Sequence, residues 1–231
     1  MKIKYNKYAG VMQMDNTLQH SNDLLKTGTT TIGLVCKDGI VLAADMRATA
    51  GSLIVNKRTD KIISIADTMA VTMAGTVSDA QLMARLIKAE IALKKFRSGF
   101  EPNVKESANM LAGLVYGNIR RMSMIPGISH FLLGGKDSTG FYLYDIFPDG
   151  SLTLIDDYVS SGSGSVFAYG VLENTYDPNL TVDEGVNLAV RAINAALQRD
   201  TYSGNGINVM TITKKGAKRV IEKVLNTQLT I

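Results

Sequence analysis

The chain has 231 residues, 45% of them hydrophobic, and its formal charge is +4 because 25 Lys and Arg oppose 21 Asp and Glu. This length and apolar content suit one globular domain, and the scattered charges form no run that would indicate a nucleic-acid or membrane-surface partner. The chain offers no apolar segment of the roughly twenty residues that a transmembrane helix needs. The single cysteine, Cys36, cannot form an internal disulfide, so we expect a buried thiol in a cytoplasmic protein.

Residues 1–28 differ in composition from the rest of the chain. They are rich in Asn, Gln, Lys and Met, and they lack the continuous apolar stretch of a secretory signal. Too few apolar residues recur at a regular spacing for this segment to pack strongly. We therefore expect a leader over residues 1–28, either a flexible extension or a removable propeptide, followed by one domain over residues 29–231.

The first half of that domain is predicted to place strands before helices. Alternating or continuous apolar runs flank the turn pairs Asp38-Gly39 and Asp67-Thr68, which is typical of β-hairpins. Apolar residues at helical spacing follow, and prolines and glycines delimit them. The expected elements are strands over 30–35, 40–44, 62–66 and 69–74, then helices over 78–97 and 103–122.

The second half repeats this order of elements. Apolar runs separated by turn residues predict a three-stranded antiparallel meander, and the capping box that starts at Thr181 and ends at Glu184 marks the start of a helix. The expected elements are strands over 128–133, 140–147 and 151–158, helices over 165–174 and 182–199, and a last strand over 207–213. The pattern predicts an α+β fold in which two stacked antiparallel sheets are flanked by helices, a four-layer αββα sandwich.

Three consecutive threonines follow Gly28, at the junction between the leader and the first strand. They could simply begin a strand, since β-branched residues favour strands. If the chain is cut between Gly28 and Thr29, however, Thr29 carries a hydroxyl nucleophile and a free α-amine on one residue. The reference pKa of such an amine is about 7.7–8.0, so it can accept the hydroxyl proton near neutral pH.

Six short motifs occur in an order and at intervals that resemble a proteasome β subunit, most closely the archaeal type. They are Thr29-Thr30-Thr31-Ile32-Gly33-Leu34, Ala44-Asp45-Met46-Arg47, Asp60-Lys61, Met73-Ala74-Gly75, Ser161-Gly162-Ser163-Gly164-Ser165 and Gln198-Arg199-Asp200-Thr201-Tyr202-Ser203-Gly204. The resemblance implies an N-terminal-nucleophile (Ntn) hydrolase fold. It also implies assembly with proteasome α subunits and other β subunits into stacked heptameric rings, which degrade unfolded polypeptides and work indirectly with a regulatory ATPase.

The same resemblance assigns catalytic roles. Thr29 matches the nucleophile, Lys61 the cation that stabilises its alkoxide, and Asp45 the carboxylate that orients Lys61. Alone, Lys61 would be read as a solvated surface group and Asp45 as a turn residue. Gly75 matches the position whose backbone N–H faces the tetrahedral oxyanion. Three further residues match those that hydrogen-bond around the terminal amine and its water: Ser163, Asp200 and Ser203.

The family's first substrate pocket maps onto mostly small or apolar residues, and this implies cleavage after large hydrophobic residues. The matching positions are Ala48, Thr59, Ile63, Met73, Val77 and Gln81. Backbone atoms of Thr49 and Gly75 would hold the extended peptide. The run from Gly162 to Ser165 lacks the Lys-Ser/Thr ending of a phosphate-binding loop, and neither His20 nor His130 has ligand-like spacing, so we expect no cofactor and no metal.

The leader gains a role from this chemistry. While Gly28 remains attached, the nitrogen of Thr29 is an amide and is not basic, so we expect activation by self-cleavage at the bond between Gly28 and Thr29. The alternative is a non-catalytic structural β subunit of the same ring, a role found where the nucleophile or the lysine is missing. Here the sequence retains both.

Overall fold

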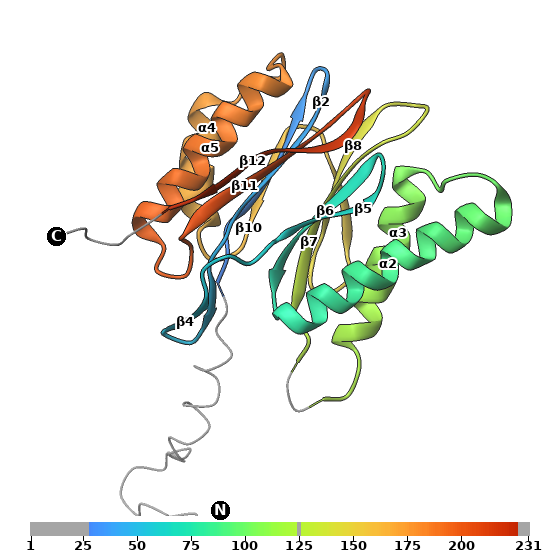
Figure 1. Cartoon of the computed structure of the whole chain (residues 1–231), viewed down its shortest axis with the longest axis horizontal. Coiled ribbons are helices and arrows are strands. Elements are labelled where there is room, and N and C mark those ends of the chain that lie inside the picture. The colour runs from blue at the N-terminus through green and yellow to red at the C-terminus, as the bar shows by residue number, and fades with distance from the viewer. Residues whose placement is uncertain (1–27, 124–125, 226–231) are drawn as a thin grey trace, which may run out of the picture.

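The computed structural model describes residues 28–123 and 126–225. In this part of the chain, two five-stranded antiparallel sheets and one short hairpin combine with helices (Figure 1). Residues 1–27, which hold His20 and all of the predicted leader except Gly28, lie outside the described residues, as do residues 226–231. None of the helices within the described ranges has the length and apolar character that a membrane crossing needs.

The first sheet contains the strand that follows Thr29. From edge to edge its strands are β10 (Tyr158–Ser161), β1 (Thr31–Cys36), β2 (Gly39–Asp45), β11 (Gly206–Thr213) and β12 (Gly216–Val224). β1 and β2 form the predicted hairpin, with Cys36 opposite Gly39. Every residue of β2 is buried, so Asp45 at its end lies inside the molecule.

The second sheet is a meander of consecutive strands. Their order is β5 (Ile62–Ala66), β6 (Met69–Gly75), β7 (Ser129–Lys136), β8 (Phe141–Ile146) and β9 (Leu152–Ile155). A separate hairpin pairs β3 (Ala48–Ala50) with β4 (Leu53–Asn56), and all four residues of β4 are exposed.

The helices cover the outer faces of the two sheets, as Figure 1 shows. Their bounds are α2 (Val77–Ser98), α3 (Val104–Ile119), α4 (Ser165–Thr175) and α5 (Val182–Arg199). One apolar cluster joins α2 and α3 to the second sheet, and another joins α4 and α5 to the first sheet. A third cluster, which includes Leu42 and Leu132, fills the space between the sheets. The predicted αββα layering is therefore confirmed.

Local signals explain where the helices start and end. Thr181 and Glu184 form the predicted capping box at the start of α5, and Asn103 and Glu106 form a second one at the start of α3. Each box gives hydrogen-bond partners to backbone N–H groups that the helix itself leaves unpaired. α2 ends at Gly99, whose φ of 75° suits glycine.

Three expectations about the elements were wrong, and the structure adds strands that were not predicted. The strand expected over 151–158 ends at Ile155 as β9, because the chain turns at Asp157, whose carboxylate accepts the N–H of Tyr158 at 2.6 Å. β10, which was not predicted, then joins the other sheet. The strand over 207–213 does not end the core, because β12 pairs with it beyond the turn. The β3–β4 hairpin was not predicted. The helix expected to reach residue 122 ends at Ile119.

Candidate active site

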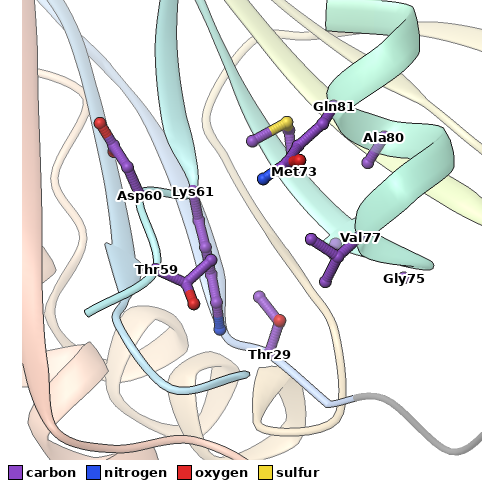
Figure 2. A pocket seen from close by; sticks show the side chains of 10 residues that line it. Thr29, Thr59, Asp60, Lys61, Met73, Gly75, Val77, Ala80 and Gln81 are labelled. Carbon is purple, nitrogen blue, oxygen red and sulfur yellow. The ribbon is translucent and has the colours of Figure 1, made fainter. Parts of the chain in front are cut away.

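A pocket opens at one end of the second sheet, beside the start of α2. Its empty volume is about 290 Å³, part of it open to solvent. The residues that line it are Thr29, Thr59, Asp60, Lys61, Met73, Ala74, Gly75, Val77, Ala80 and Gln81. Figure 2 shows the side chain of Lys61 extending toward Thr29, with Val77 on the other side of the hydroxyl. The structure thus brings the leader junction and the lysine to one cavity.

Lys61 and Asp45 form a buried ion pair behind this cavity. Lys61 Nζ lies 2.6 Å from Asp45 Oδ1, and the two side chains are 6% and 0% exposed. Burial lowers the pKa of Lys61 below its usual value, while the charge of Asp45 and its hydrogen bond oppose this shift. A lysine held in this way is a cation whose protonation state depends on its neighbours, and such groups are common at functional sites.

The carboxylate of Asp45 is also bound by three backbone N–H groups. Oδ1 accepts the N–H of Thr30 at 3.0 Å, and Oδ2 accepts the N–H groups of Arg47 and Gly204, each at 2.9 Å. A buried charge needs such partners, because an unpaired carboxylate would be strongly disfavoured away from water. Asp45 therefore holds together the segment after Thr29, the end of β2 and the loop after α5.

Thr29 is buried at the leader junction. Its Oγ1 donates a hydrogen bond to the carbonyl of Gly28 at 2.7 Å, and its N–H donates to Ser163 Oγ at 3.3 Å. A Cβ on Gly28 would lie 2.0 Å from the Cβ of Tyr202 and 2.6 Å from Ser163 Oγ. The junction consequently accepts no side chain at residue 28.

A chain of hydroxyls surrounds the nitrogen of Thr29. Asp200 Oδ2 accepts hydrogen bonds from Ser163 at 2.7 Å and from Ser203 at 2.6 Å, and the Ser203 hydroxyl lies 2.7 Å from that of Thr30. Ser163 therefore contacts both the nitrogen of Thr29 and the carboxylate of Asp200. The three residues that the sequence analysis placed around the amine are joined in one network.

Gly75 lies where β6 meets α2, in the wall of the cavity that faces Thr29. Its φ is 101°, and a Cβ there would lie 2.2 Å from the carbonyl oxygen of Ile128. Only glycine suits this conformation and this close approach. The backbone can thus reach the cavity at this point without a side chain in the way.

The expected substrate-binding residues divide into two groups. Four of them line the cavity: Thr59, Met73, Val77 and Gln81. Three do not: Ala48 and Thr49 lie in the separate hairpin strand β3, and Ile63 packs against the core under α2 and α3. The sequence analysis missed Asp60, Ala74 and Ala80. Asp60 and Ala74 are next to predicted site residues in the sequence, and Ala80 follows Val77 by three residues, which places both on one face of a helix. These two signals could have identified the missed residues.

His130 lies apart from this cavity and is held by protein groups on both ring nitrogens. Its Nε2 lies 2.5 Å from Asp145 Oδ1 and its Nδ1 lies 2.7 Å from Ser161 Oγ. Across residues 28–123 and 126–225, no three His, Cys, Asp or Glu side chains gather in a way that could hold a metal ion.

Comparisons with known proteins agree with this geometry. The model of a family described as "Proteasome subunit" matches residues 25–212. The proteasome subunit beta of Archaeoglobus profundus is 46% identical over 88% of this chain and 95% of its own length. Those of Ferroglobus placidus and Methanothermobacter thermautotrophicus are 47% and 44% identical, over 84% and 85% of this chain and 90% and 91% of their own lengths.

The family model covers the segments that carry Thr29, Asp45 and Lys61, and the αββα layering is that of Ntn hydrolases. The chain therefore belongs to the proteasome subunit family, as a β subunit of the archaeal type and a peptidase of the threonine class.

Proposed function

We propose that this chain is a catalytic β subunit of a 20S proteasome core and that Thr29 is its nucleophile. The single observation that carries this proposal is the convergence of Thr29 and the buried Lys61 on one cavity, with Asp45 bonded to the lysine. The reaction is hydrolysis of peptide bonds in unfolded proteins. The subunit works in stacked heptameric rings with α subunits and other β subunits, in the cytoplasm, and a regulatory ATPase supplies substrate.

The leader, residues 1–28, is removed by the subunit itself. Thr29 Oγ attacks the carbonyl carbon of Gly28, the bond to the Thr29 nitrogen breaks, and that nitrogen takes up the hydroxyl proton and becomes an amine. Water then hydrolyses the resulting ester. The hydrogen bond from Thr29 Oγ1 to the Gly28 carbonyl supports this step, because it places the nucleophile beside its target.

In the mature subunit the same atoms act on substrate. The free amine of Thr29, directly or through a water, accepts the proton of Oγ as the hydroxyl attacks the scissile carbonyl carbon, and it later gives that proton to the leaving amine. The Gly75 N–H binds the oxyanion and the Lys61 ammonium stabilises the alkoxide. Ser163, Asp200 and Ser203 hold the amine in place. Water finally cleaves the acyl ester and frees the nucleophile.

Met73, Val77 and Ala80 make one wall of the cavity apolar, and this supports cleavage after large hydrophobic residues. Thr59 and Gln81 complete the lining. Ala48 and Ile63 lie outside it and remain proposals for the first pocket, and Thr49 remains a proposed backbone contact for the extended peptide. No cofactor takes part in this mechanism.

Intact-mass measurement of assembled particles tests the proposal. We expect the wild-type chain to begin at Thr29 and to gain the mass of one threonine-directed electrophile, and we expect the Thr29→Ala chain to keep its leader. A Thr29→Ala chain that loses its leader without another protease would refute self-cleavage. A mature wild-type particle that retains Met1 and no label would instead favour the structural, non-catalytic role.

A further inference from the structure

The turn that presents Lys61 is closed by the residue before it. Asp60 Oδ1 accepts the N–H of Ile62 at 3.2 Å, so the carboxylate bridges the two residues on either side of the lysine. Figure 2 shows the side chains of Asp60 and Lys61 pointing in opposite directions, the first away from Thr29 and the second toward it. A contact that holds Asp60 therefore acts on the residue next to Lys61, on the side that faces away from Thr29 (Figure 2).

Arg219, on the outermost strand of the other sheet, binds both neighbours of Lys61. Its Nη2 donates to Asp60 Oδ2 at 2.6 Å and to the carbonyl oxygen of Ile62 at 3.0 Å. Asn208 Nδ2, on the adjacent strand β11, lies 3.5 Å from Asp60 Oδ1. The guanidinium thus holds the side chain of Asp60 and the backbone of Ile62, and Lys61 is the only residue between them.

These contacts connect the edges of two different sheets. β12, which carries Arg219, is the last strand of the first sheet, and β5, which follows Lys61, is the first strand of the second. The N–H of Ala217 donates to the carbonyl of Asp67 at 2.8 Å, so β12 also holds the β5–β6 turn. Within the described residues, β12 therefore contacts the hairpin that follows the lysine at both of its ends.

The ion pair between Arg219 and Asp60 is too exposed to contribute much to the free energy of folding. The side chains of Arg219 and Asp60 are 30% and 49% exposed, and ion pairs in such positions contribute little to folding. Arg219 also reaches Glu222 at 3.4 Å, and that carboxylate is 61% exposed. The contacts to Asp60 and Ile62 differ from the contact to Glu222 because they hold the two chain neighbours of Lys61, the buried cation of the candidate site.

We propose that Arg219 is a positioning residue for the peptidase reaction, and that it acts by holding the residues on both sides of Lys61, Asp60 through its carboxylate and Ile62 through its backbone carbonyl. The inference rests on the proposed catalytic role of Lys61. The ammonium of Lys61 is held at its other end by Asp45, so the lysine is anchored from its backbone and from its head group. With both anchors in place, the cation stays beside the hydroxyl and amine of Thr29 throughout the reaction.

The experiment compares Arg219→Ala with Arg219→Lys and with Glu222→Gln in assembled, leader-free particles. Glu222→Gln is the matched control, because it removes the negative charge of the exposed partner of Arg219 and leaves the contacts to Asp60 and Ile62 intact. We expect Arg219→Ala to lower kcat on a fluorogenic peptide about tenfold while KM stays within about twofold. Arg219→Lys keeps one cationic donor and should recover most of the loss, and Glu222→Gln should match the wild type.

A pH profile separates positioning from a general structural effect. When Lys61 moves away from Thr29 and Asp60 loses its counterion, the Thr29 amine loses cationic neighbours, so its pKa rises. We expect the acid limb of kcat/KM to move up by about half a pH unit in Arg219→Ala. The other charged groups near Lys61, namely Asp45, Asp200 and Arg47, are the same in every variant.

The outcomes are distinct. A wild-type particle that an electrophile labels at Thr29, combined with an Arg219→Ala particle of unchanged kcat and pH profile, would overturn this inference alone. A wild-type particle that is not labelled at Thr29 would overturn the proposed function instead. If Arg219→Ala does not assemble, Arg219→Gln, which keeps an amide donor for the Ile62 carbonyl, takes its place with the same expected direction.

Discussion

The candidate catalytic centre and the pocket wall beside it are built in different ways. In the centre, Thr29, Asp45 and Lys61 come from separate segments. Asp45 is joined to Lys61 by a buried ion pair and to the N–H of Thr30, the residue after Thr29, by a buried hydrogen bond. The wall runs without interruption from Met73 to Gln81, where β6 passes into α2. A change in the centre therefore disturbs several segments at once, whereas a change in the wall stays local. We expect large effects on rate from the first and small effects on selectivity from the second.

Replacing the cation of the centre should have the largest effect. In Lys61→Ala, the Asp45 carboxylate keeps its three backbone N–H partners, so the fold should survive. We expect kcat/KM to fall by about 10³-fold because the alkoxide loses its stabilising charge, and we expect the leader to remain attached. Peptide assays and intact mass measure both effects. Activity within tenfold of the wild type would contradict the role of Lys61.

The leader junction should respond next most strongly. Gly28→Ala would place a Cβ 2.0 Å from the Tyr202 Cβ, so the junction must shift and the Gly28 carbonyl must leave the Thr29 hydroxyl. We expect the rate of leader removal to fall by about 10²-fold. Mass spectrometry at successive times measures this rate. A chain produced directly from Thr29 is the control, since its peptidase activity should be unaffected. Processing at the wild-type rate would show that the junction is roomier than described.

The pocket wall should give a smaller and more selective effect. Val77→Ala removes two methyl groups that face the cavity, so binding of a large apolar side chain weakens while the chemistry is untouched. We expect kcat/KM for peptides cleaved after Leu or Phe to fall about three- to tenfold, mostly through KM. Leu82→Ala, on the same helix but outside the lining, is the matched control and should change neither constant. A fall in kcat alone would place Val77 in the chemistry.

Cys36 serves as a reference for the core, because it lies outside both the catalytic centre and the pocket wall, in the apolar cluster between the first sheet and its helices. Burial raises the pKa of its thiol from 9.0 to about 12. The protonated thiol therefore stabilises the fold fully below pH 9.0, and this contribution is lost as the pH rises toward 12. At about pH 8 we expect iodoacetamide to label the unfolded chain but not the native one. Equal labelling rates would contradict the burial.

The fold could largely be predicted from the sequence because apolar periodicity and turn residues are local signals. The β1–β2 hairpin and the capping box of α5 are examples. β10 was not predicted, because it begins at Tyr158, the last residue of the strand expected over 151–158, and no apolar pattern separates the two. β12 was missed because its sequence mixes charged and apolar residues and gives no apolar run, and five of its nine residues are exposed.

The site was predicted less evenly. We identified Thr29, Asp45 and Lys61 as one site from motifs that resemble a family, because sequence spacing alone does not show which residues of separate strands lie close together in the fold. The pocket lining was found only in part, because Ile63 lies on a strand next to the cavity while its side chain packs under the helices. Arg219 could not be predicted, because its importance depends on two strand edges that meet only in the folded chain.

The placement of β12 has a consequence for biosynthesis. Ribosomes make proteins from the amino end, so Thr29, Asp45, Lys61 and Asp200 all emerge before the strand that carries Arg219. A nascent chain that stops at β11 would contain every proposed reactive group, yet the Asp60–Ile62 turn would lack both of its contacts to Arg219. The surroundings of Lys61 are therefore completed only after β12 has been made, later than every group that takes part in the proposed reaction.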